Sequence, residues 1–203
     1  MRLGITTVDS GDFKDPKIAR RLLSSLSAIP EDKIFLMNQV HSDKVAIAEE
    51  GTSLPKADAL VIGNLKPPYA CVVRVADCMP LFIISDGVLV GCVHAGWRPL
   101  AGGIIQNTVK LTGSSIHIYA GPHICYKCFE VGEEVQEFFP PASRIGNRIS
   151  LFNALEKISE SVGIKASDVL LLKAKGYCSI ENPAYFSHRG GDNKRMAAFA
   201  FQY

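Results

Sequence analysis

The sequence predicts a mixed α/β or α+β fold in a single domain that spans residues 1–203. Short apolar segments rich in β-branched residues outnumber the helical patterns, and the two kinds of segment interleave along the chain. A length of 203 residues with 47% hydrophobic residues suits one compact core and is short for two independent domains. No Gly/Ser-rich or Pro-rich linker divides the chain, so mixed sheets flanked by helices are expected.

Four segments are expected to form regular structure in the first third of the chain. Apolar residues recur at helical spacing over 15–27, which predicts a helix there. The apolar run 34–37 predicts a strand that continues into the segment 38–41. We expect 45–48 to be the hairpin neighbour of that strand, and 59–62 to form another short strand.

The middle of the chain is its most β-rich part. Strands are expected at 71–75, 81–84 and 88–93, and Asp86-Gly87 favours a tight hairpin turn between the last two. The remaining segments alternate between the helical and the extended pattern. Helices are expected at 102–111, 131–139 and 151–162, and strands at 115–120, 169–172 and 196–201.

Composition excludes several classes of function. A formal net charge of +2 is too weak a bias to indicate nucleic acid binding. No apolar run is long enough for a transmembrane helix, and the N-terminus lacks the apolar region of a secretory signal. Six cysteines in such a chain are expected to be reduced thiols in the cytoplasm. The sequence indicates no oligomeric state.

Three residues stand out as candidate metal ligands: His41, Cys78 and His94. Each is expected to follow directly on a strand, where a rigid element presents its side chain to a cleft. Thiolate and imidazole together favour zinc or copper over magnesium and calcium. Their long separations differ from the short ligand pairs of a structural zinc knuckle and suit a catalytic site, which keeps a fourth position open.

A blander interpretation must be weighed beside this one. The same residues could be unrelated: one histidine solvated, the cysteine a packed thiol, the other histidine a hydrogen-bonding residue of the core. The unusual small and polar neighbours of each residue favour the metal site. Asp77, next to Cys78, could orient a metal ligand or shuttle a proton, or it could cap a turn.

Six segments carry a more specific signal because they occur in order from about residue 34 to the C-terminus. They are NQVHSDKV, ADALV, VRVADCMPLFI, VGCVHAGWRPLAGGI, GPHICYKCFEVGEEV and FSHRGGDNKRMAAF. Together they resemble the laccase-domain or "polyphenol oxidase" family of purine nucleoside phosphorylases. The resemblance implies zinc on His41, Cys78 and His94, and α/β/β/α-type layers related to a cysteine-dependent toxin deamidase.

The activity that this resemblance implies is phosphorolysis of a purine nucleoside. Adenosine, inosine or guanosine would react with phosphate to give the base and ribose 1-phosphate, with adenosine deaminase and methylthioadenosine phosphorylase as further activities. Cys78, His94 and Asp77 are then the expected catalytic residues. Phosphate needs fixed cations, for which arginine is well suited. The candidates within the matched segments are Arg74, Arg98, Arg189 and Arg195.

The sequence departs from the family pattern at two places. The region before NQVH is shorter than is common in the family. The segment 124–128, Ile-Cys-Tyr-Lys-Cys, replaces the commoner Ile-Gly-Pro-Cys-Cys type, so that Cys128 matches the family position and Cys125 is either shifted or extra. The C-x-x-C spacing also admits a redox motif, although cysteines in a loop near the substrate entrance fit the context better.

Three other functions compete with phosphorolysis, of which a non-enzymatic module that binds a partner or nucleotide ranks lowest because it leaves the polar turn motifs unexplained. A copper-dependent polyphenol oxidase fits the family label, but a multicopper centre needs more histidines than the five in this chain. Met79 also adjoins Cys78, and adjacent residues of an extended chain face opposite sides. The second rival is a metal-free cysteine hydrolase or deamidase, with Cys78 as nucleophile and His94 as base.

Overall fold

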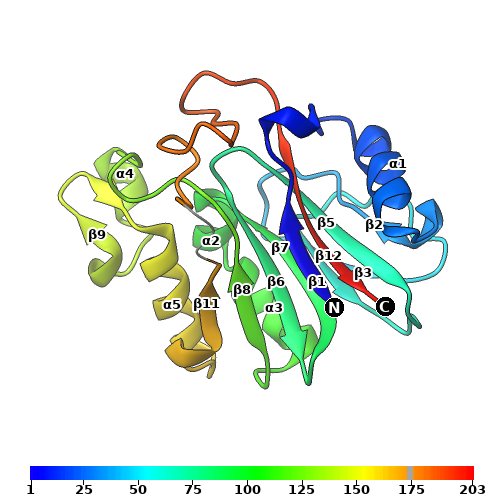
Figure 1. Ribbon diagram of the computed structural model, residues 1–203. Helices are drawn as coiled ribbons and strands as arrows, with labels where there is room; N and C mark the ends of the chain where they lie inside the picture. The colour runs from blue at the N-terminus through cyan, green and yellow to red at the C-terminus, as the bar shows by residue number, and fades with distance from the viewer. Residues whose placement is uncertain (173–175) are drawn as a thin grey trace.

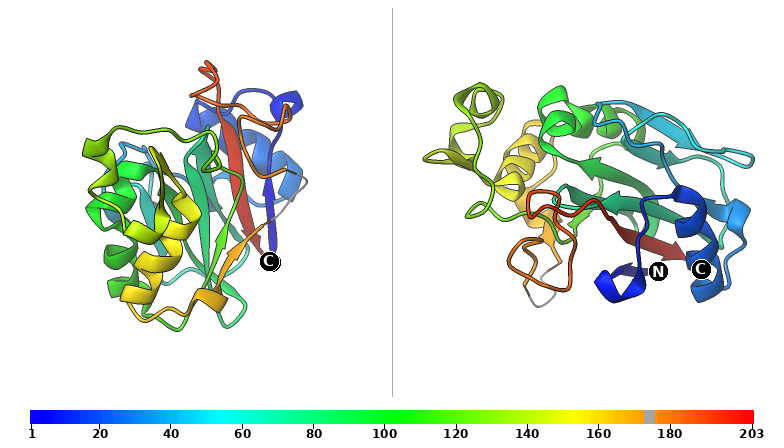
Figure 2. Two further views of the ribbon diagram at one scale, coloured as in Figure 1. Left: turned by 90° about the vertical axis from the view of Figure 1, so that its left-hand side faces the viewer. Right: turned by 90° about the horizontal axis from the view of Figure 1, so that it is seen from above.

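Two β-sheets stack face to face at the centre of the molecule, and helices cover both outer sides (Figure 1). The computed structural model describes residues 1–172 and 176–203. The left view of Figure 2 looks along the layers, with the helices α2, α3 and α5 on one side and α1 on the other. This arrangement is the α/β/β/α layering that the sequence resemblance implies.

The larger sheet has six strands in the order β11-β8-β6-β7-β4-β3. Its central strands pair antiparallel, and β3 and β11 pair parallel at the two edges. The strands are β3 (Val45–Ala48), β4 (Ala59–Ile62), β6 (Met79–Ser85), β7 (Val88–Ala95), β8 (His117–Ala120) and β11 (Val169–Leu171).

The smaller sheet has four strands in the order β1-β12-β5-β2. Its strands are β1 (Arg2–Ile5), β2 (Ile34–Phe35), β5 (Tyr69–Val75) and β12 (Met196–Gln202). The chain ends therefore lie side by side, because β1 pairs antiparallel with β12. A separate small hairpin is formed by β9 (Arg144–Ile145) and β10 (Arg148–Ile149).

Five α-helices and four short 3₁₀ helices are found in the described part of the chain. They are α1 (Pro16–Ser27), α2 (Trp97–Gly102), α3 (Ile104–Thr112), α4 (Glu133–Gln136) and α5 (Leu151–Ser161), and the 3₁₀ helices are Val8–Ser10, Glu31–Lys33, Pro141–Ser143 and Ala166–Asp168. Asp15 caps α1 by accepting the Lys17 backbone N–H at 2.8 Å, and Pro16 takes the first helical position, where a missing N–H is harmless. No helix in the described part of the chain has the length and apolar character to cross a membrane.

Three apolar clusters lie between these layers. The first, which includes Leu81, Ile105 and Leu155, packs α2, α3 and α5 onto the six-stranded sheet. The second fills the space between the two sheets, and the third packs α1 onto the outer face of the four-stranded sheet. Strands buried on both faces explain why their sequences are continuous apolar runs rather than alternating ones.

Most of the expected elements are confirmed with shifted ends. The helix expected at 15–27 spans Pro16–Ser27, and the Asp86-Gly87 turn has the positive φ angles of 49° and 78° that tight hairpins require. The pairing expected for 45–48 is wrong: β3 pairs parallel with β4, whereas β2 belongs to the other sheet. The helix expected at 131–139 is reduced to α4, and α2 and β1 were not expected.

Candidate metal centre

The structure brings His41, Cys78 and His94 together from three different segments. His41 lies in the loop between β2 and β3, Cys78 in the turn between β5 and β6, and His94 within β7 rather than after a strand as expected. One ligand atom from each lies within 4.8 Å of the others, and Cys78 Sγ is 3.9 Å from His41 Nε2. We call this group the His–Cys–His centre.

The backbone at this centre adopts an unusual conformation at two residues. His41 has a φ of 57° and Asp77 a φ of 84°, in the left-handed region that favours glycine. Each such residue costs on the order of 1 kcal/mol and persists only where its surroundings hold it. The backbone around His41 is held by one buried carboxylate, that of Asp58.

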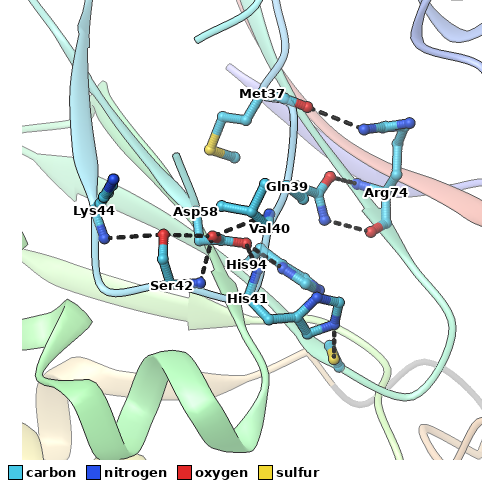
Figure 3. A network of polar contacts seen from close by, with 10 residues as sticks. Met37, Gln39, Val40, His41, Ser42, Lys44, Asp58, Arg74 and His94 are labelled. Atoms are coloured by element: carbon cyan, nitrogen blue, oxygen red, sulfur yellow. Dashed lines mark hydrogen bonds and ion pairs between the residues drawn. The ribbon is translucent and has the colours of Figure 1, made fainter. Parts of the chain in front are cut away.

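Asp58 fixes both histidines and has no exposed surface (0%). Its carboxylate accepts the backbone N–H of Val40, His41 and Ser42 at 3.2, 3.0 and 2.7 Å, and the Ser42 hydroxyl at 2.9 Å. It also lies 2.9 Å from His94 Nδ1. Figure 3 draws this contact as a dashed line. A histidine that donates Nδ1–H to a carboxylate presents Nε2 to a metal, which is the usual outer support of a metal ligand.

The charges of these groups favour a cation at the centre. Burial alone raises the pKa of Asp58, but the hydrogen bonds and charge of His94 and the donors of Ser42 outweigh it and lower that pKa to about 2. Burial likewise raises the pKa of Cys78, and the two histidines overcome this and lower it to about 6. Burial lowers the pKa of His94, while the Cys78 thiolate and Asp58 raise it to about 9. Without metal, Cys78 and His94 therefore form a thiolate–imidazolium pair.

The donor set itself fits a thiophilic metal ion. Two imidazoles and one thiolate are ligands of zinc or copper, and three protein donors leave a position for a substrate or water. A metal at this centre would take the place of the His94 proton beside the thiolate, because thiolate and neutral imidazole are the metal-binding forms. The residues present therefore fit such an ion.

Gly96 gives the Cys78 sulfur its room. A Cβ atom built on Gly96 would lie 2.8 Å from Cys78 Sγ and 3.6 Å from His41 Cδ2, which is too close to the sulfur for any real Cβ. A glycine at this position is thus required by the packing of the centre rather than by its own φ angle of −79°.

We expect Gly96→Ala to lower the kcat/KM of any reaction at this centre by about tenfold while the protein stays folded. The added methyl group would displace the Cys78 sulfur, and small displacements of groups in a reactive site have large effects on rate. The measurement is kcat/KM together with metal content. Gly132→Ala is the matched control, since the nearest atoms to a Cβ there belong to the carboxylate at the end of the flexible, exposed Glu134 side chain. If Gly96→Ala, Gly132→Ala and wild type had equal kcat/KM, the close approach of Gly96 to the Cys78 sulfur would not matter for catalysis.

The centre opens into a cavity of about 450 Å³, within the size range of small-molecule sites. All four arginines selected from the sequence line this cavity, and so does Asp77. Lys14, Gln39, Phe129 and His188 line it as well and were not anticipated as site residues. Trp97, a possible partner for base stacking from its place in the sequence, also lines it.

Arg74 is half-buried and has the most side-chain contacts to other segments among the four arginines. It donates one N–H to the carbonyl of Lys14 and another to that of Met37 at 3.0 Å. Its backbone N–H and carbonyl are both bound by the Gln39 side chain, at 2.9 and 2.8 Å. Its buried Nε has no partner among the described residues, and burial lowers the pKa of the guanidinium. A cation held in this way retains a donor for an anionic ligand.

The other three arginines are held more loosely. The Arg98 guanidinium lies 4.3 Å from the centre of the Trp97 ring, a cation–π contact. Arg189 donates to the carbonyl of Glu130 at 3.0 Å, and Arg195 donates to that of Lys194 at 2.8 Å. Their long side chains leave further N–H groups for a ligand.

Asp77 joins three segments beneath the cavity. Its Oδ1 accepts the hydroxyls of Ser179 at 2.6 Å and Ser187 at 2.7 Å, and its Oδ2 accepts the Arg189 backbone N–H at 2.6 Å. Because both oxygens are already engaged, the geometry favours a positioning role over proton transfer. Of the alternatives considered from the sequence, orientation of the site is the one these contacts support.

Sequence reasoning missed Asp58 as a functional residue. A clue to its role was present in the sequence, because Asp58 directly precedes the apolar run 59–62. A carboxylate buried at such a position needs hydrogen-bond donors around it. The sequence near Asp58 does not indicate which groups donate to it; the structure shows that they lie in the loop around His41.

Comparison with known proteins adds three relationships. A family model described as "Multi-copper polyphenol oxidoreductase laccase" matches residues 8–201. The chain is 34% identical over 177 residues to a purine nucleoside phosphorylase of Aquifex aeolicus, which covers 83% of this chain and 84% of that protein. It is 30% identical over 199 residues to adenosine deaminase RL5 of an unknown prokaryotic organism, covering 84% of this chain and 75% of that one.

Solved structures resemble the fold over nearly the same range. YlmD from Geobacillus stearothermophilus superposes with a TM-score of 0.75 at 27% identity, covering 89% of this chain and 77% of that one. Protein NMB0706 of Neisseria meningitidis superposes with a TM-score of 0.73 at 30% identity, covering 89% and 78%. The layered α+β architecture is thus shared with these proteins.

Proposed function

The chain belongs to the family of multi-copper polyphenol oxidoreductase laccases, and on that premise we propose that it is a zinc-dependent purine nucleoside phosphorylase. The observation that carries the proposal is a cavity of about 450 Å³ with the His–Cys–His centre in its wall and four arginines around it. Relatives named purine nucleoside phosphorylase support the choice of substrate, and one named adenosine deaminase supports deamination as a second activity.

In this proposal His41, Cys78 and His94 hold the zinc ion, which when bound supplies a positive charge that attracts and orients an anionic substrate group. Phosphate and a ribosyl cation-like centre must meet in line, so catalysis depends on position and charge. Phosphate oxygen attacks the anomeric carbon, and the electron pair of the broken glycosidic bond leaves with the purine.

The residues of the chain divide these tasks between them. Arg74, Arg98, Arg189 and Arg195 are proposed to bind phosphate, which suits arginine because its N–H groups contact two oxygens at once. Asp77 is proposed to position Arg189 through the backbone hydrogen bond at 2.6 Å. The rings of Trp97 and Phe129 line the cavity and offer faces for the purine.

The direct test is incubation of the zinc-loaded protein with inosine and phosphate. Hypoxanthine and ribose 1-phosphate should form in equal amounts, and omission of phosphate should stop both. A parallel reaction with adenosine, followed for ammonia and for adenine, separates deamination from phosphorolysis. Base release that is absent, or that proceeds equally without phosphate, would overturn the proposal.

Copper-dependent oxidation of phenols is the first alternative, since the same donors accept copper. The surroundings of Met79 argue against a blue-copper site. This residue is fully buried in the cluster between the six-stranded sheet and its helices, and it does not line the cavity. Elemental analysis of protein purified without added metal separates the two, with zinc expected.

A metal-free cysteine hydrolase or deamidase is the second alternative, favoured by the thiolate–imidazolium pair of Cys78 and His94. Alkylation by iodoacetamide distinguishes a free nucleophile from a metal ligand. Because the pKa of Cys78 lies near 6, its thiolate is present above that pH and lost below it. In chelated protein we expect the alkylation rate of Cys78 to rise through pH 6 and then level off.

Zinc should protect Cys78 from this reaction at every pH at which the ion stays bound, measured by mass spectrometry of its peptide. The fully buried Cys71 serves as the unreactive internal control. Rapid alkylation of Cys78 in zinc-loaded, active protein would instead favour the hydrolase.

A further inference from the structure

A second group of metal-ligating side chains lies outside the His–Cys–His centre. Cys125, Cys128, Cys178 and Glu181 each offer one ligand atom, and these four atoms lie within 4.8 Å of one another. We call this group the Cys–Glu cluster. Its members come from two segments of the form C-x-x-C and C-x-x-E, and the C-x-x-C spacing is typical of structural zinc sites.

Each segment is a tight turn that places its first and fourth residues side by side. In the first turn the N–H groups of Cys128 and Phe129 donate to the carbonyl of Cys125 at 3.1 and 3.0 Å. In the second turn the Asn182 N–H donates to the carbonyl of Cys178 at 3.0 Å. The ligand pairs are therefore set by backbone geometry, before any ion is bound.

A short parallel bridge between His123 and Cys178 joins the two turns. His123 donates its N–H to the carbonyl of Tyr177 at 2.9 Å, and Ser179 donates its N–H to the carbonyl of His123 at 3.1 Å. These bonds bring together residues that are distant in sequence and align one ligand pair against the other. A preformed arrangement of this kind lowers the cost of binding an ion.

The backbone around Cys178 favours a thiolate at that residue. Cys178 Sγ accepts the backbone N–H of Cys125 at 3.4 Å, and the N–H groups of Ile180 and Glu181 also point at it. Cys125 and Cys178 are only 5% and 3% exposed. Several N–H donors around a buried sulfur stabilise a negative charge, and a buried negative charge needs a cation close by.

We propose that Cys125, Cys128, Cys178 and Glu181 bind one structural zinc ion. Three thiolates and one carboxylate supply four donors, a closed tetrahedral set without a position for substrate. This distinguishes the cluster from the His–Cys–His centre, where three donors leave one position open. Glu181 is the exposed member, and its carboxylate lies 3.9 Å from Cys128 Sγ, so it closes the cluster from the solvent side.

The zinc ion would hold the wall of the cavity in place. Ser179, next to Cys178, donates to the Asp77 carboxylate, and Ile124, next to Cys125, donates its N–H to the Asp77 carbonyl at 3.0 Å. Both turns therefore contact the residue that precedes Cys78. The ion would fasten these two supports to each other beside the cavity.

The test is the zinc content of variants that remove one centre at a time. Wild type should retain two zinc ions per chain, Cys78→Ala one, and Cys78→Ala with Cys128→Ser none. Lys127→Ala in the Cys78→Ala background is the matched control, because Lys127 belongs to the same turn and offers no ligand at the cluster. It should keep its single ion.

Two further measurements keep the proposal testable if Cys128→Ser does not fold. Cobalt bound to Cys78→Ala protein should show a thiolate charge-transfer band of the strength expected for three sulfur ligands. Glu181→Gln in that background should lose zinc to a chelator at least about tenfold more readily. Metal-free Cys78→Ala protein, or two thiols missing from a denaturing thiol titration because of a disulfide, would overturn the proposal.

Discussion

Replacing Cys78 with alanine is expected to empty the His–Cys–His centre and to lower kcat/KM for phosphorolysis by well over a hundredfold. Cys78 supplies the only thiolate of this centre, 3.9 Å from His41 Nε2. Loss of an outer partner of a metal ligand costs roughly 10- to 100-fold in affinity or activity, and loss of the ligand itself costs more. Zinc content and the rate of inosine phosphorolysis are measured on the same preparation.

Cys78→Ser is the informative companion, because it keeps the size of the side chain and replaces the sulfur with a poor zinc ligand. It should lose metal and activity as Cys78→Ala does, with unchanged circular dichroism. Variants that keep zinc at this centre but lose turnover would point to Cys78 as a nucleophile. Variants that keep both would place the chemistry elsewhere in the molecule.

The central strands were predictable because their signals are local. The runs 71–75, 81–84 and 88–93 are apolar on both faces, and Asp86-Gly87 specifies the turn between two of them. A strand whose two faces are both covered by other layers of the fold has apolar side chains at consecutive positions. Their existence and order therefore follow from the sequence, and the ends differ by only a few residues.

The pairing of strands that are distant in sequence was not predictable, because its signals are not local. β12 pairs with both β5 and β1, and β3 pairs parallel with β4 across a long loop. These pairings depend on which apolar face meets which, a property that no local window contains. The expected hairpin of 34–37 with 45–48 was wrong because neighbouring strands in sequence can belong to different sheets.

The candidate metal ligands were identified from residue type and from the ordered motifs around them, but the residues that support them were not. Asp58, Gly96 and the partners of Asp77 act through contacts that exist only in the folded chain. The same holds for the Cys–Glu cluster. The C-x-x-C pair was visible in the sequence, whereas Cys178 and Glu181 join it only through the backbone bridge at His123.

Asp58→Asn should have the second-largest effect on the protein. The change removes the negative charge that holds His94 Nδ1 and that accepts three backbone N–H groups around His41. We expect roughly a 10- to 100-fold loss in zinc affinity and activity, the usual cost of an outer partner. The free energy of unfolding should fall by about 2 to 4 kcal/mol, because buried donors lose a charged acceptor. Asp43→Asn, in the loop that carries His41, is the matched control and should change little.

The pH dependence of the stability difference between wild type and Asp58→Asn shows whether Asp58 acts through its charge or through its packing. Its pKa in the folded chain, about 2, lies below the ordinary value of 3.8, so its stabilising contribution is fully present above pH 4. As the pH falls from 4 to 2 the carboxylate takes up a proton and that contribution, on the order of 2 kcal/mol, disappears. In chelated protein, the stability difference between wild type and Asp58→Asn should therefore narrow over this range. A difference that stays constant down to pH 2 would mean that the carboxylate acts through packing, and that His94 is oriented without its charge.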